Sequence, residues 1–247
     1  MEERNSALRD DYGFDVPQAV LDRLKASGKR IRRIPESAVR DLTYAPRPKW
    51  GYRFVKRAVD ICVSLIALIV LLIPMLIISL CIYINDPGSV LFTHYRVGMN
   101  AKQFQIYKFR TMYLNTPKYL ATNDVRNPKQ YITRVGRVLR KTSLDELPQL
   151  WNVLKGDMSI IGPRPLISDE LEIHRMRVRF GAYNVRPGIT GLAQINGRDL
   201  TSSADKIRWD VEYVHKFGPA MDMKILLSTI PQVFHGRDVV EGGKKVK

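Results

Sequence analysis

Two adjacent carboxylates, Asp145 and Glu146, have the clearest capacity for chemistry in this sequence. They stand in the string TSLDELP, where Pro148 predicts that a helix starts close to Asp145. One interpretation is structural, because Ser143 and Glu146 match a capping box and acidic residues stabilise the first turn of a helix. Taken by itself, the string favours this interpretation.

The same position also suits phosphate chemistry. Free N–H groups at a helix start bind phosphate oxygens, a carboxylate there can attack phosphorus to form an acyl phosphate, and a neighbouring carboxylate can hold Mg²⁺. Adjacent helical residues point about 100° apart. Asp145 and Glu146 are therefore expected to take two different roles rather than to form a symmetric acid–base pair.

Cationic side chains elsewhere could hold the phosphates of such a substrate. Arg164 stands between two prolines in the string GPRP, so its backbone is stiff and its guanidinium suits bidentate phosphate binding. Lys108 and Arg110 add two further cations. The loop at residues 186–198 alternates glycines with hydroxyl, amide and cationic side chains. It suits a nucleotide or sugar, although it lacks the spacing of a P-loop or dinucleotide fingerprint.

Hydropathy patterns predict the elements that position these groups. Residues 90–93 and 104–107 are strand-like, with a turn at residues 97–100 between them. Residues 131–155 are predicted to be helical in two pieces, and Gly156 ends the second piece.

A further apolar stripe, at residues 226–234, follows helical spacing. It suits either packing into a core or lying at a membrane interface, and a core position is the default expectation. Residues 113–130 are polar and are expected to form a loop.

The longest apolar run covers residues 61–84 and contains no charged side chain. About 20 apolar residues suffice to cross a bilayer, so a membrane segment is expected. Pro74 kinks or breaks this helix, which leaves two topologies open: a kinked helix that crosses once, or a hairpin that enters and leaves on the cytoplasmic face. Both flanks are basic, so the retention of Lys and Arg on the cytoplasmic side selects neither. Ile73 precedes the proline, and Ser79 is the nearby hydroxyl for the freed backbone.

The composition narrows the function classes. The formal charge of +16 points to an anionic partner: nucleic acid, a lipid surface or a phosphorylated substrate. A hydrophobic share of 45% argues against wholesale disorder. The two cysteines, Cys62 and Cys81, make neither a disulfide scaffold nor a zinc site. The alternative function is a membrane-tethered nucleic-acid-binding protein, although the sequence has no helix-turn-helix, zinc-finger or RNA-binding signature.

Four strings follow one another along the chain: YKFRTM from residue 107, RKTSLDELPQL from residue 140, GDMSIIGPRP from residue 156, and RPGITG from residue 186 followed by NGR. In this order they resemble the bacterial sugar transferases known as monotopic phosphoglycosyl transferases, or polyprenyl-phosphate hexose-1-phosphate transferases. The resemblance runs from about residue 52 to about residue 236.

The resemblance implies that a sugar 1-phosphate moves from a UDP-sugar to a membrane polyprenyl (undecaprenyl) phosphate with release of UMP, as the first step of a polysaccharide or glycoconjugate pathway. The implied mechanism is ping-pong, with Asp145 as the nucleophile of a phosphosugar-aspartyl intermediate and Glu146 as its partner at the Mg²⁺ site. Arg140 matches a cation near the lipid phosphate. Four further cations are assigned to phosphate or nucleotide binding: Lys108, Arg110, Arg164 and Arg198.

The resemblance also favours the hairpin at Pro74. The expected fold class is α/β and mainly helical: a re-entrant membrane helix hairpin plus a small cytoplasmic α/β catalytic domain with interfacial amphipathic helices. The expected location is the inner (cytoplasmic) membrane of a bacterium, with the catalytic domain on its cytoplasmic face. Expected partners are the UDP-sugar, polyprenyl phosphate and membrane lipid, with no nucleic acid. The oligomeric state stays open, with a homo-oligomer among the alternatives.

The expected domain boundaries follow from the same analysis. They are a charged N-terminal extension and linker at residues 1–49, the broken membrane helix at 50–85, the catalytic domain at 86–240 and a mobile tail at 241–247.

Overall fold

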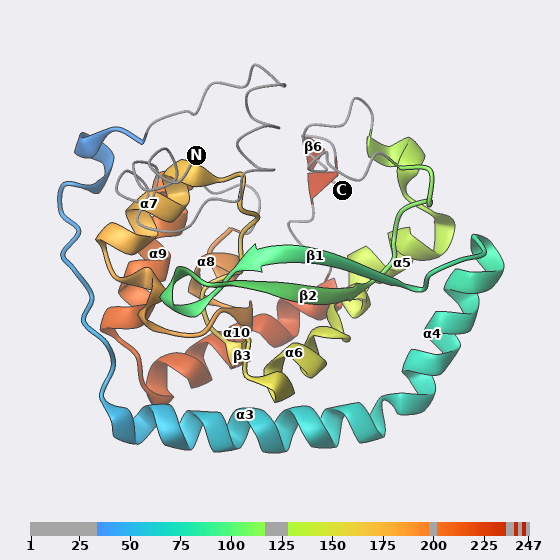
Figure 1. Cartoon of the computed structure of the whole chain (residues 1–247), viewed down its shortest axis with the longest axis horizontal. Helices are drawn as coiled ribbons and strands as arrows, with labels where there is room; N and C mark the ends of the chain where they lie inside the picture. The colour runs from blue at the N-terminus through green and yellow to red at the C-terminus, as the bar shows by residue number, and fades with distance from the viewer. Residues whose placement is uncertain (1–33, 117–127, 198–201, 236–239, 242–243, 246–247) are drawn as a thin grey trace, which may run out of the picture.

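The computed structural model describes residues 34–116, 128–197, 202–235, 240–241 and 244–245. Within these ranges the protein is a mixed α/β structure that is mainly helical, as the sequence predicts. Figure 1 shows one long helix, α3, lying beneath the other elements, with α4 rising from one end of it.

The apolar run forms α3 (Trp50–Val70) and α4 (Leu72–Asn85), which are bent by 61° relative to each other. The break is at Leu71, three residues before Pro74, whereas the sequence predicts it at the proline itself. Pro74 has no N–H for the carbonyl four residues earlier, and its ring collides with that carbonyl, which belongs to Val70. The helix therefore ends at Val70, and Pro74 occupies the first turn of α4, where a missing N–H costs little.

The hydroxyl of Ser79 does not bond the backbone groups that are freed at this break. It donates to the carbonyl of Met75 at 2.8 Å, inside α4. Within the part of the chain that the structure describes, no single helix is long and apolar enough to cross a bilayer. Only α3 and α4 taken together, across their bend, meet that criterion.

The face of α3 that packs on the rest of the protein is its polar face. Asp60 and Ser64 are buried, and Asp60 accepts the backbone N–H of Ile160 at 3.1 Å. Arg57 donates to two carbonyl groups near the end of α6 (Gln149–Lys155), at 2.5 and 2.8 Å. A helix leaves its last carbonyls without intrahelical partners, so this arginine completes α6 while it attaches α3.

A second attachment is made by Asp222, in the first turn of α10 (Pro219–His235). One carboxylate oxygen accepts from Tyr52 at 2.9 Å and from Lys56 at 2.6 Å, both on α3. The other oxygen accepts from the buried hydroxyl of Tyr213 at 2.8 Å. One carboxylate thus joins α3 to the core.

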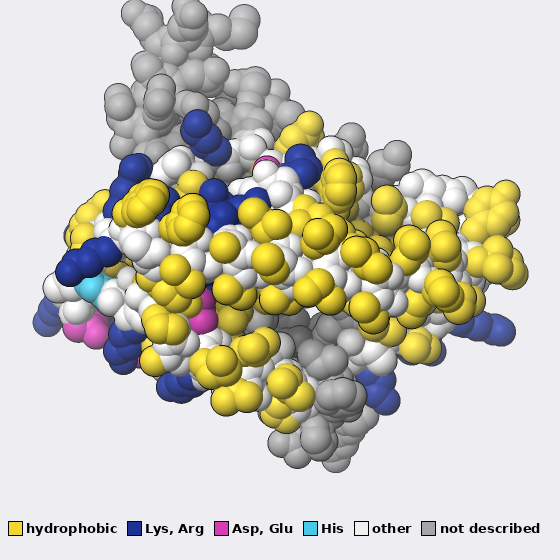
Figure 2. Space-filling model, turned by 90° about the horizontal axis from the view of Figure 1, so that it is seen from below, with side chains coloured by type: hydrophobic (Ala, Val, Ile, Leu, Met, Phe, Trp, Pro, Cys, Tyr) yellow, Lys and Arg dark blue, Asp and Glu magenta, His cyan; other side chains and the backbone are white. Residues whose placement is uncertain are grey.

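The opposite face of α3 and most of α4 are apolar and exposed, and Figure 2 shows these side chains as a band across the molecule. This is the reverse of an ordinary surface helix, which turns its apolar stripe toward the core. The side chains concerned are 39% to 77% exposed: Trp50, Phe54, Val55, Val59, Ile61, Val63, Leu65, Ile66, Ile69 and Val70 on α3, and Leu72, Ile73, Leu76, Ile77, Leu80, Tyr83 and Ile84 on α4.

The predicted antiparallel hairpin is confirmed as β1 (Leu91–Val97) and β2 (Gln103–Phe109), with both strands longer than expected. In the observed register, Arg96 is opposite Phe104, so even-numbered residues of both strands share one face. Arg96 and Lys108 therefore lie on the same face of the hairpin.

Two shorter strand pairs complete the β-structure of the described residues. β3 (Ser159–Ile161) pairs in parallel with β4 (Gly188–Thr190), and β5 (Val240–Glu241) pairs antiparallel with β6 (Lys244–Lys245). The predicted tail at residues 241–247 lies partly outside the described ranges. The short helical elements include η1 (Glu36–Val39), η2 (Met99–Ala101), η4 (Pro128–Tyr131), η6 (Ala182–Asn184) and α8 (Leu192–Ile195).

The two helical pieces predicted within residues 131–155 are confirmed as α5 (Arg134–Thr142) and α6. Thr133 caps α5, because its hydroxyl accepts the backbone N–H of Gly136 at 2.8 Å. Gly156 ends α6 in the left-handed conformation, with φ at 93°.

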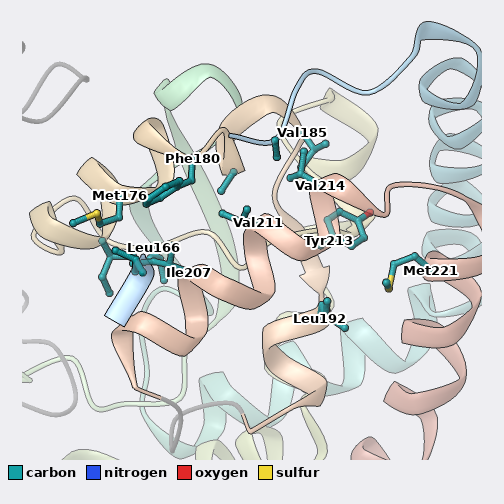
Figure 3. Close-up of a cluster of buried hydrophobic side chains, with 14 of the residues drawn as sticks. Leu166, Met176, Phe180, Val185, Leu192, Ile207, Val211, Tyr213, Val214 and Met221 are labelled. Atoms are coloured by element: carbon teal, nitrogen blue, oxygen red, sulfur yellow. The ribbon is translucent and has the colours of Figure 1, made fainter. Parts of the chain in front are cut away.

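The main core lies among α7 (Leu171–Arg179), α9 (Ser203–His215) and α10, as Figure 3 shows. Ile34, Val39 and Ala45 are buried in the same core, so residues 34–45 of the predicted N-terminal extension pack on the domain; residues 1–33 lie outside the described ranges. The other buried members are Ile161, Leu166, Ile173, Met176, Phe180, Ala182, Val185, Leu192, Ile207, Val211, Tyr213, Val214, Met221 and Ile225.

A buried polar network crosses this core. The Arg177 guanidinium lies 2.5 Å from the Asp210 carboxylate, and both side chains are almost fully buried. Next to this pair, Nε2 of His174 donates to the carbonyl of Ile167 at 2.8 Å, so Nδ1 accepts from the hydroxyl of Tyr183. Burial lowers the pKa of His174 to about 3, which keeps its imidazole neutral.

The apolar stripe predicted at residues 226–234 is described only in part, because the side chains of Val233 and Phe234 lie outside the described ones. Its core expectation is wrong for Leu226, Leu227 and Ile230, which are 39%, 60% and 48% exposed. The reason is the rotation of α10, which turns Met221 and Ile225 into the core and leaves Leu226, Leu227 and Ile230 on the outer side.

Candidate active site

Asp145 and Glu146 lie in η5 (Leu144–Glu146), a 3₁₀ turn between α5 and α6. The sequence predicts a helix start close to Asp145, and this is wrong. The helix α6 begins at Gln149, directly after Pro148. The capping-box interpretation is also wrong. Ser143 adopts the left-handed conformation, with φ at 59°, and its side chain makes no capping hydrogen bond to the turn. A sharp chain reversal, rather than a full helix N-terminus, therefore presents the two carboxylates.

Strand β2 brings Lys108 to this reversal. Its Nζ lies 2.7 Å from Oε1 of Glu146, and each side chain is 17% exposed. The guanidinium of Arg164 lies 3.5 Å from the same oxygen. Three predicted site residues from three separate segments are thus brought together around one carboxylate oxygen.

A buried amide holds these segments in register. Oδ1 of Asn152, on α6, accepts the backbone N–H of Tyr107 at 3.1 Å, and its Nδ2 donates to the carbonyl of Gln105 at 2.7 Å. Because Asn152 is fully buried, this pair of hydrogen bonds fixes α6 against β2. The turn that precedes α6 is consequently held beside Lys108.

The Asp145 carboxyl is half-buried, and its titration is set by its surroundings. Burial raises its pKa above the ordinary value, the charge of Lys108 opposes this increase, and the charge of Glu146 adds to it. Arg140 and Arg164 also act to lower this pKa. The ionised form, which attack on phosphorus requires, thus depends on three surrounding cations.

The remaining predicted cations are placed differently. Arg140 lies in the last turn of α5 and donates from Nε to the hydroxyl of Thr111 at 2.9 Å. Arg110 is buried and forms an ion pair with Asp86 at 3.1 Å, just after α4, and also donates to the Asp86 carbonyl. The structure thus brings Arg110 to the end of the broken helix rather than to Glu146. Arg198 lies outside the described residues.

A pocket of about 250 Å³ opens beside Glu146 and is also lined by Lys108 and Arg164. Two further lining residues are Arg96 and Gln149, which no pattern in the sequence singles out. Arg96 Nε and Gln149 Nε2 are buried and have no hydrogen-bond partner among the described residues. Burial and the neighbouring Arg164 lower the pKa of Arg96 to about 10, so it stays charged at neutral pH. Buried donors without partners are costly, which means that this pocket suits an anionic ligand.

The sequence patterns carry no signal for Arg96 in this position. The turn expected at residues 97–100 would pair residue 96 with residue 101 and place Arg96 and Lys108 on opposite faces of the hairpin, whereas the observed pairing of Arg96 with Phe104 places them on the same face. Gln149 carries no signal either, because nothing in its type or spacing shows that its amide faces a pocket.

The glycines of the GPRP and RPGITG strings allow close approach of two backbones. A Cβ at Gly162 would lie 2.4 Å from the carbonyl oxygen of Arg186, and one at Gly191 would lie 2.0 Å from that of Gly162. At Gly188 the distance to the nitrogen of Gly162 would be 2.1 Å. The described part of the loop that was expected to wrap a nucleotide thus packs against the segment that carries Arg164.

The donor set fits a Mg²⁺ ion that is shared with a substrate. The described residues contain no cluster of three or more His, Cys, Asp or Glu side chains, so they offer no complete protein cage for a metal. Mg²⁺ is commonly held by one or two carboxylates together with substrate phosphates. Asp145 and Glu146 supply two such carboxylates, and Lys108 and Arg164 compete for one oxygen of Glu146.

The family model of the bacterial sugar transferases matches residues 51–236, about three quarters of the chain. The chain belongs to the bacterial sugar transferase family. This confirms the resemblance carried by the four strings, and the matched region of this sugar transferase includes the pocket, Asp145 and Glu146.

Curated relatives agree with this assignment. The exopolysaccharide production protein ExoY of Sinorhizobium fredii is 40% identical over 205 residues, which cover 77% of this sugar transferase and 89% of ExoY. The undecaprenyl-phosphate galactose phosphotransferase of Salmonella typhimurium is 41% identical over 196 residues, which cover 73% of this chain and 40% of the relative. The UDP-N-acetylgalactosamine-undecaprenyl-phosphate N-acetylgalactosaminephosphotransferase of Aeromonas hydrophila is 38% identical over 190 residues, 75% of this chain and 45% of the relative.

Proposed function

We propose that this sugar transferase moves a sugar 1-phosphate from a UDP-sugar to undecaprenyl phosphate and releases UMP. The observation that carries the proposal is the position of Asp145 next to Glu146, beside a pocket that is lined by three cationic side chains: Lys108, Arg164 and Arg96. The names of the Salmonella and Aeromonas relatives support the lipid acceptor, and that of ExoY supports a role in exopolysaccharide synthesis.

In the first step, a carboxylate oxygen of Asp145 attacks the phosphorus that is bonded to the sugar. A new O–P bond forms, the bond between that phosphorus and the bridging oxygen breaks, and UMP leaves with the electron pair. Lys108, Arg164 and Arg96 hold the phosphate oxygens and stabilise the charge that develops on them. Glu146 is the side chain that would hold Mg²⁺, which when bound would neutralise the diphosphate.

In the second step, a phosphate oxygen of undecaprenyl phosphate attacks the same phosphorus. The acyl O–P bond breaks, the Asp145 carboxylate is regenerated, and the lipid diphosphosugar leaves. Arg140, which Thr111 orients, is the cation that we assign to the acceptor phosphate. The reaction is thus divided into two displacements on one carboxylate, one with the water-soluble donor and one with the membrane-bound acceptor.

The membrane placement rests on the reversed polarity of α3. Its charged face is attached to the domain, while its outer face and α4 expose apolar side chains. Burying this surface in one leaflet removes it from water, and the bend between the helices lets the chain return to the side from which it entered. We assign that side to the cytoplasmic face of the bacterial inner membrane, with the active site near the lipid headgroups.

The nucleic-acid alternative that the charge of +16 raises has a weaker basis. Lys108, Arg164 and Arg96 line a pocket together with a carboxylate. A duplex would be bound by an exposed basic stripe rather than by such a pocket.

The reaction is tested by measuring UMP release from purified protein with a UDP-sugar, undecaprenyl phosphate and Mg²⁺. Asp145→Asn is expected to lose at least about a thousandfold in turnover, because it removes the nucleophile. The matched control is Asp41→Asn, which changes an exposed carboxylate that pairs with Arg208 and is expected to keep full activity. Without acceptor, the wild-type chain is expected to gain the mass of the phosphosugar on Asp145. Full turnover by Asp145→Asn would falsify the proposal.

A further inference from the structure

A second pocket lies between α3 and the domain. It has a volume of about 320 Å³ and is lined by Arg53, Lys56, Arg57 and Asp60 of α3 and by Arg186 from the segment before β4, among others. None of its described lining residues lines the active-site pocket. It is therefore a separate feature of the interface that joins α3 to the domain.

The ionic contacts of the pocket leave an excess of positive charge. Lys56 is neutralised by Asp222 at 2.6 Å, with both side chains about 10% exposed. The remaining cations are the three guanidiniums of Arg53, Arg57 and Arg186. Only the Asp60 carboxylate faces them within the described lining.

The hydrogen bonds of these guanidiniums do not neutralise them. Arg57 donates to two backbone carbonyls of α6, and Arg186 donates from Nε to the carbonyl of Gly156 at 2.8 Å. Arg53 has one hydrogen bond within the described residues, to the sulfur of Met99 at 3.9 Å. A thioether is a weak acceptor, so Arg53 keeps most of its donor capacity for a ligand.

The mutual repulsion of these groups is visible at Arg186. Burial lowers the pKa of this arginine, and the charges of Arg57 and Arg53 lower it further. A bound anion would relieve this repulsion. Guanidiniums bind phosphate through paired, charge-assisted hydrogen bonds, and this favours a phosphate group over a simple monatomic anion.

The position of the pocket indicates the source of that phosphate. Phe54, Val55 and Val59, on the outer face of the same turns of α3, are 62%, 54% and 52% exposed. Trp50, at the start of α3, is 77% exposed and its ring stacks on that of Phe54 with centroids 5.6 Å apart. Tryptophan is enriched at the level of the lipid headgroups. The pocket therefore lies directly behind a surface suited to the headgroup region.

We propose that this pocket binds the phosphate of an anionic membrane phospholipid. The proposal rests on the membrane placement of α3 proposed above and is independent of the reaction at Asp145. A bound headgroup would supply the negative charge that Arg53, Arg57 and Arg186 lack, and would hold the amino-terminal half of α3 at a defined depth.

The experiment uses the full chain in a neutral detergent and follows its melting temperature during titration with dioleoyl-phosphatidylglycerol. A ligand that binds only the folded state stabilises it by RT ln(1 + L/Kd), where L is the free ligand concentration, so the melting temperature rises with ligand concentration and the rise reports the affinity. We expect phosphatidylglycerol to raise it and dioleoyl-phosphatidylcholine, which has the same acyl chains and no net charge, to have little effect. Arg53→Gln is expected to need about tenfold more phosphatidylglycerol, because it removes a charge-assisted contact.

The controls separate binding from folding. Arg53→Gln breaks only the contact with Met99, so its melting temperature without lipid is expected to match the wild type, and Arg53→Lys is expected to keep most of the affinity. Arg134→Gln removes an exposed charge on α5 and is expected to bind like the wild type.

Equal shifts with both lipids, or an unchanged affinity of Arg53→Gln, would overturn the proposal. A shift of the same size with soluble glycerol phosphate would overturn the lipid as its source. Because turnover is not measured, a failure of the proposed reaction leaves these outcomes unaffected.

Discussion

The ammonium of Lys108 lies 2.7 Å from Oε1 of Glu146, although the two residues are 38 positions apart. This ion pair gives the two neighbouring carboxylates different environments. Glu146 forms an ion pair with Lys108 and lies 3.5 Å from the guanidinium of Arg164. The charges of both cations act to lower the pKa of Asp145. The structure thus supports the expectation that the two residues take different roles.

The first prediction concerns the pH dependence of turnover. Asp145 must be ionised to attack, and burial raises its pKa while Lys108 lowers it. Activity should therefore rise with pH through the pKa of Asp145. Lys108→Met removes the opposing cation, so the acidic limb of the kcat profile is expected to move to higher pH. Lys102→Met, at an exposed position before β2, should leave the limb in place. A limb that stays in place in Lys108→Met would contradict the coupling.

The second prediction concerns Arg96, whose Nε is buried without a partner among the described residues. Arg96→Gln is expected to lower kcat/KM for the UDP-sugar by about tenfold to a hundredfold, the range for a hydrogen bond to a charged group. Its melting temperature should not fall, because Nε of Arg96 makes no hydrogen bond among the described residues that the substitution could remove. Tyr95→Phe removes the hydroxyl of an exposed side chain on the opposite face of β1 and serves as the control. Weaker stability with unchanged kinetics would instead assign Arg96 a purely structural role.

The third prediction concerns topology. In a Cys62→Ser, Cys81→Ser background, single cysteines are introduced by Lys49→Cys and Ser89→Cys, at exposed positions that flank the helix pair. A membrane-impermeant maleimide should label neither position in intact cells and both after permeabilisation, because a hairpin returns both flanks to the cytoplasm. Labelling of one flank from outside would show a single crossing.

The fourth prediction follows from the cause of the bend. Pro74→Ala restores an N–H that can bond the Val70 carbonyl, so α3 and α4 are expected to merge into one helix. Such a helix, from residue 50 to 85, would be about 50 Å long, enough to cross a bilayer. The same maleimide assay should then detect one flank from outside. Unchanged labelling would mean that contacts other than Pro74 maintain the bend.

The fifth prediction concerns stability. Asp210→Ala leaves the buried Arg177 guanidinium without its ion-pair partner, which is expected to cost about 3–5 kcal/mol in the free energy of unfolding. Asp41→Ala breaks the exposed pair with Arg208 and should cost much less, because solvent screens exposed pairs. Chemical denaturation of both variants in the same detergent measures the difference. Similar losses would show that the buried pair contributes no more than a surface pair.

Local patterns predicted most of the elements near the site. The β1–β2 hairpin follows from alternation and a turn, and α5 and α6 follow from helical spacing with Gly156 at the end. The start of α6 was misplaced, because a capping box and a 3₁₀ reversal use the same residue types. The choice between them depends on Asn152, whose contacts with β2 fix where the chain must turn.

The sequence by itself determined the types of the active-site residues, the broken apolar run and the family membership, because each depends on residues that are close along the chain. Tertiary structure decided which cations meet. Lys108 and Arg164 converge on Glu146, whereas Arg110, only two residues from Lys108, pairs with Asp86. It also decided that α3 turns its charged face inward. These outcomes depend on distances between remote segments, and such distances are set by packing and burial rather than by local residue patterns.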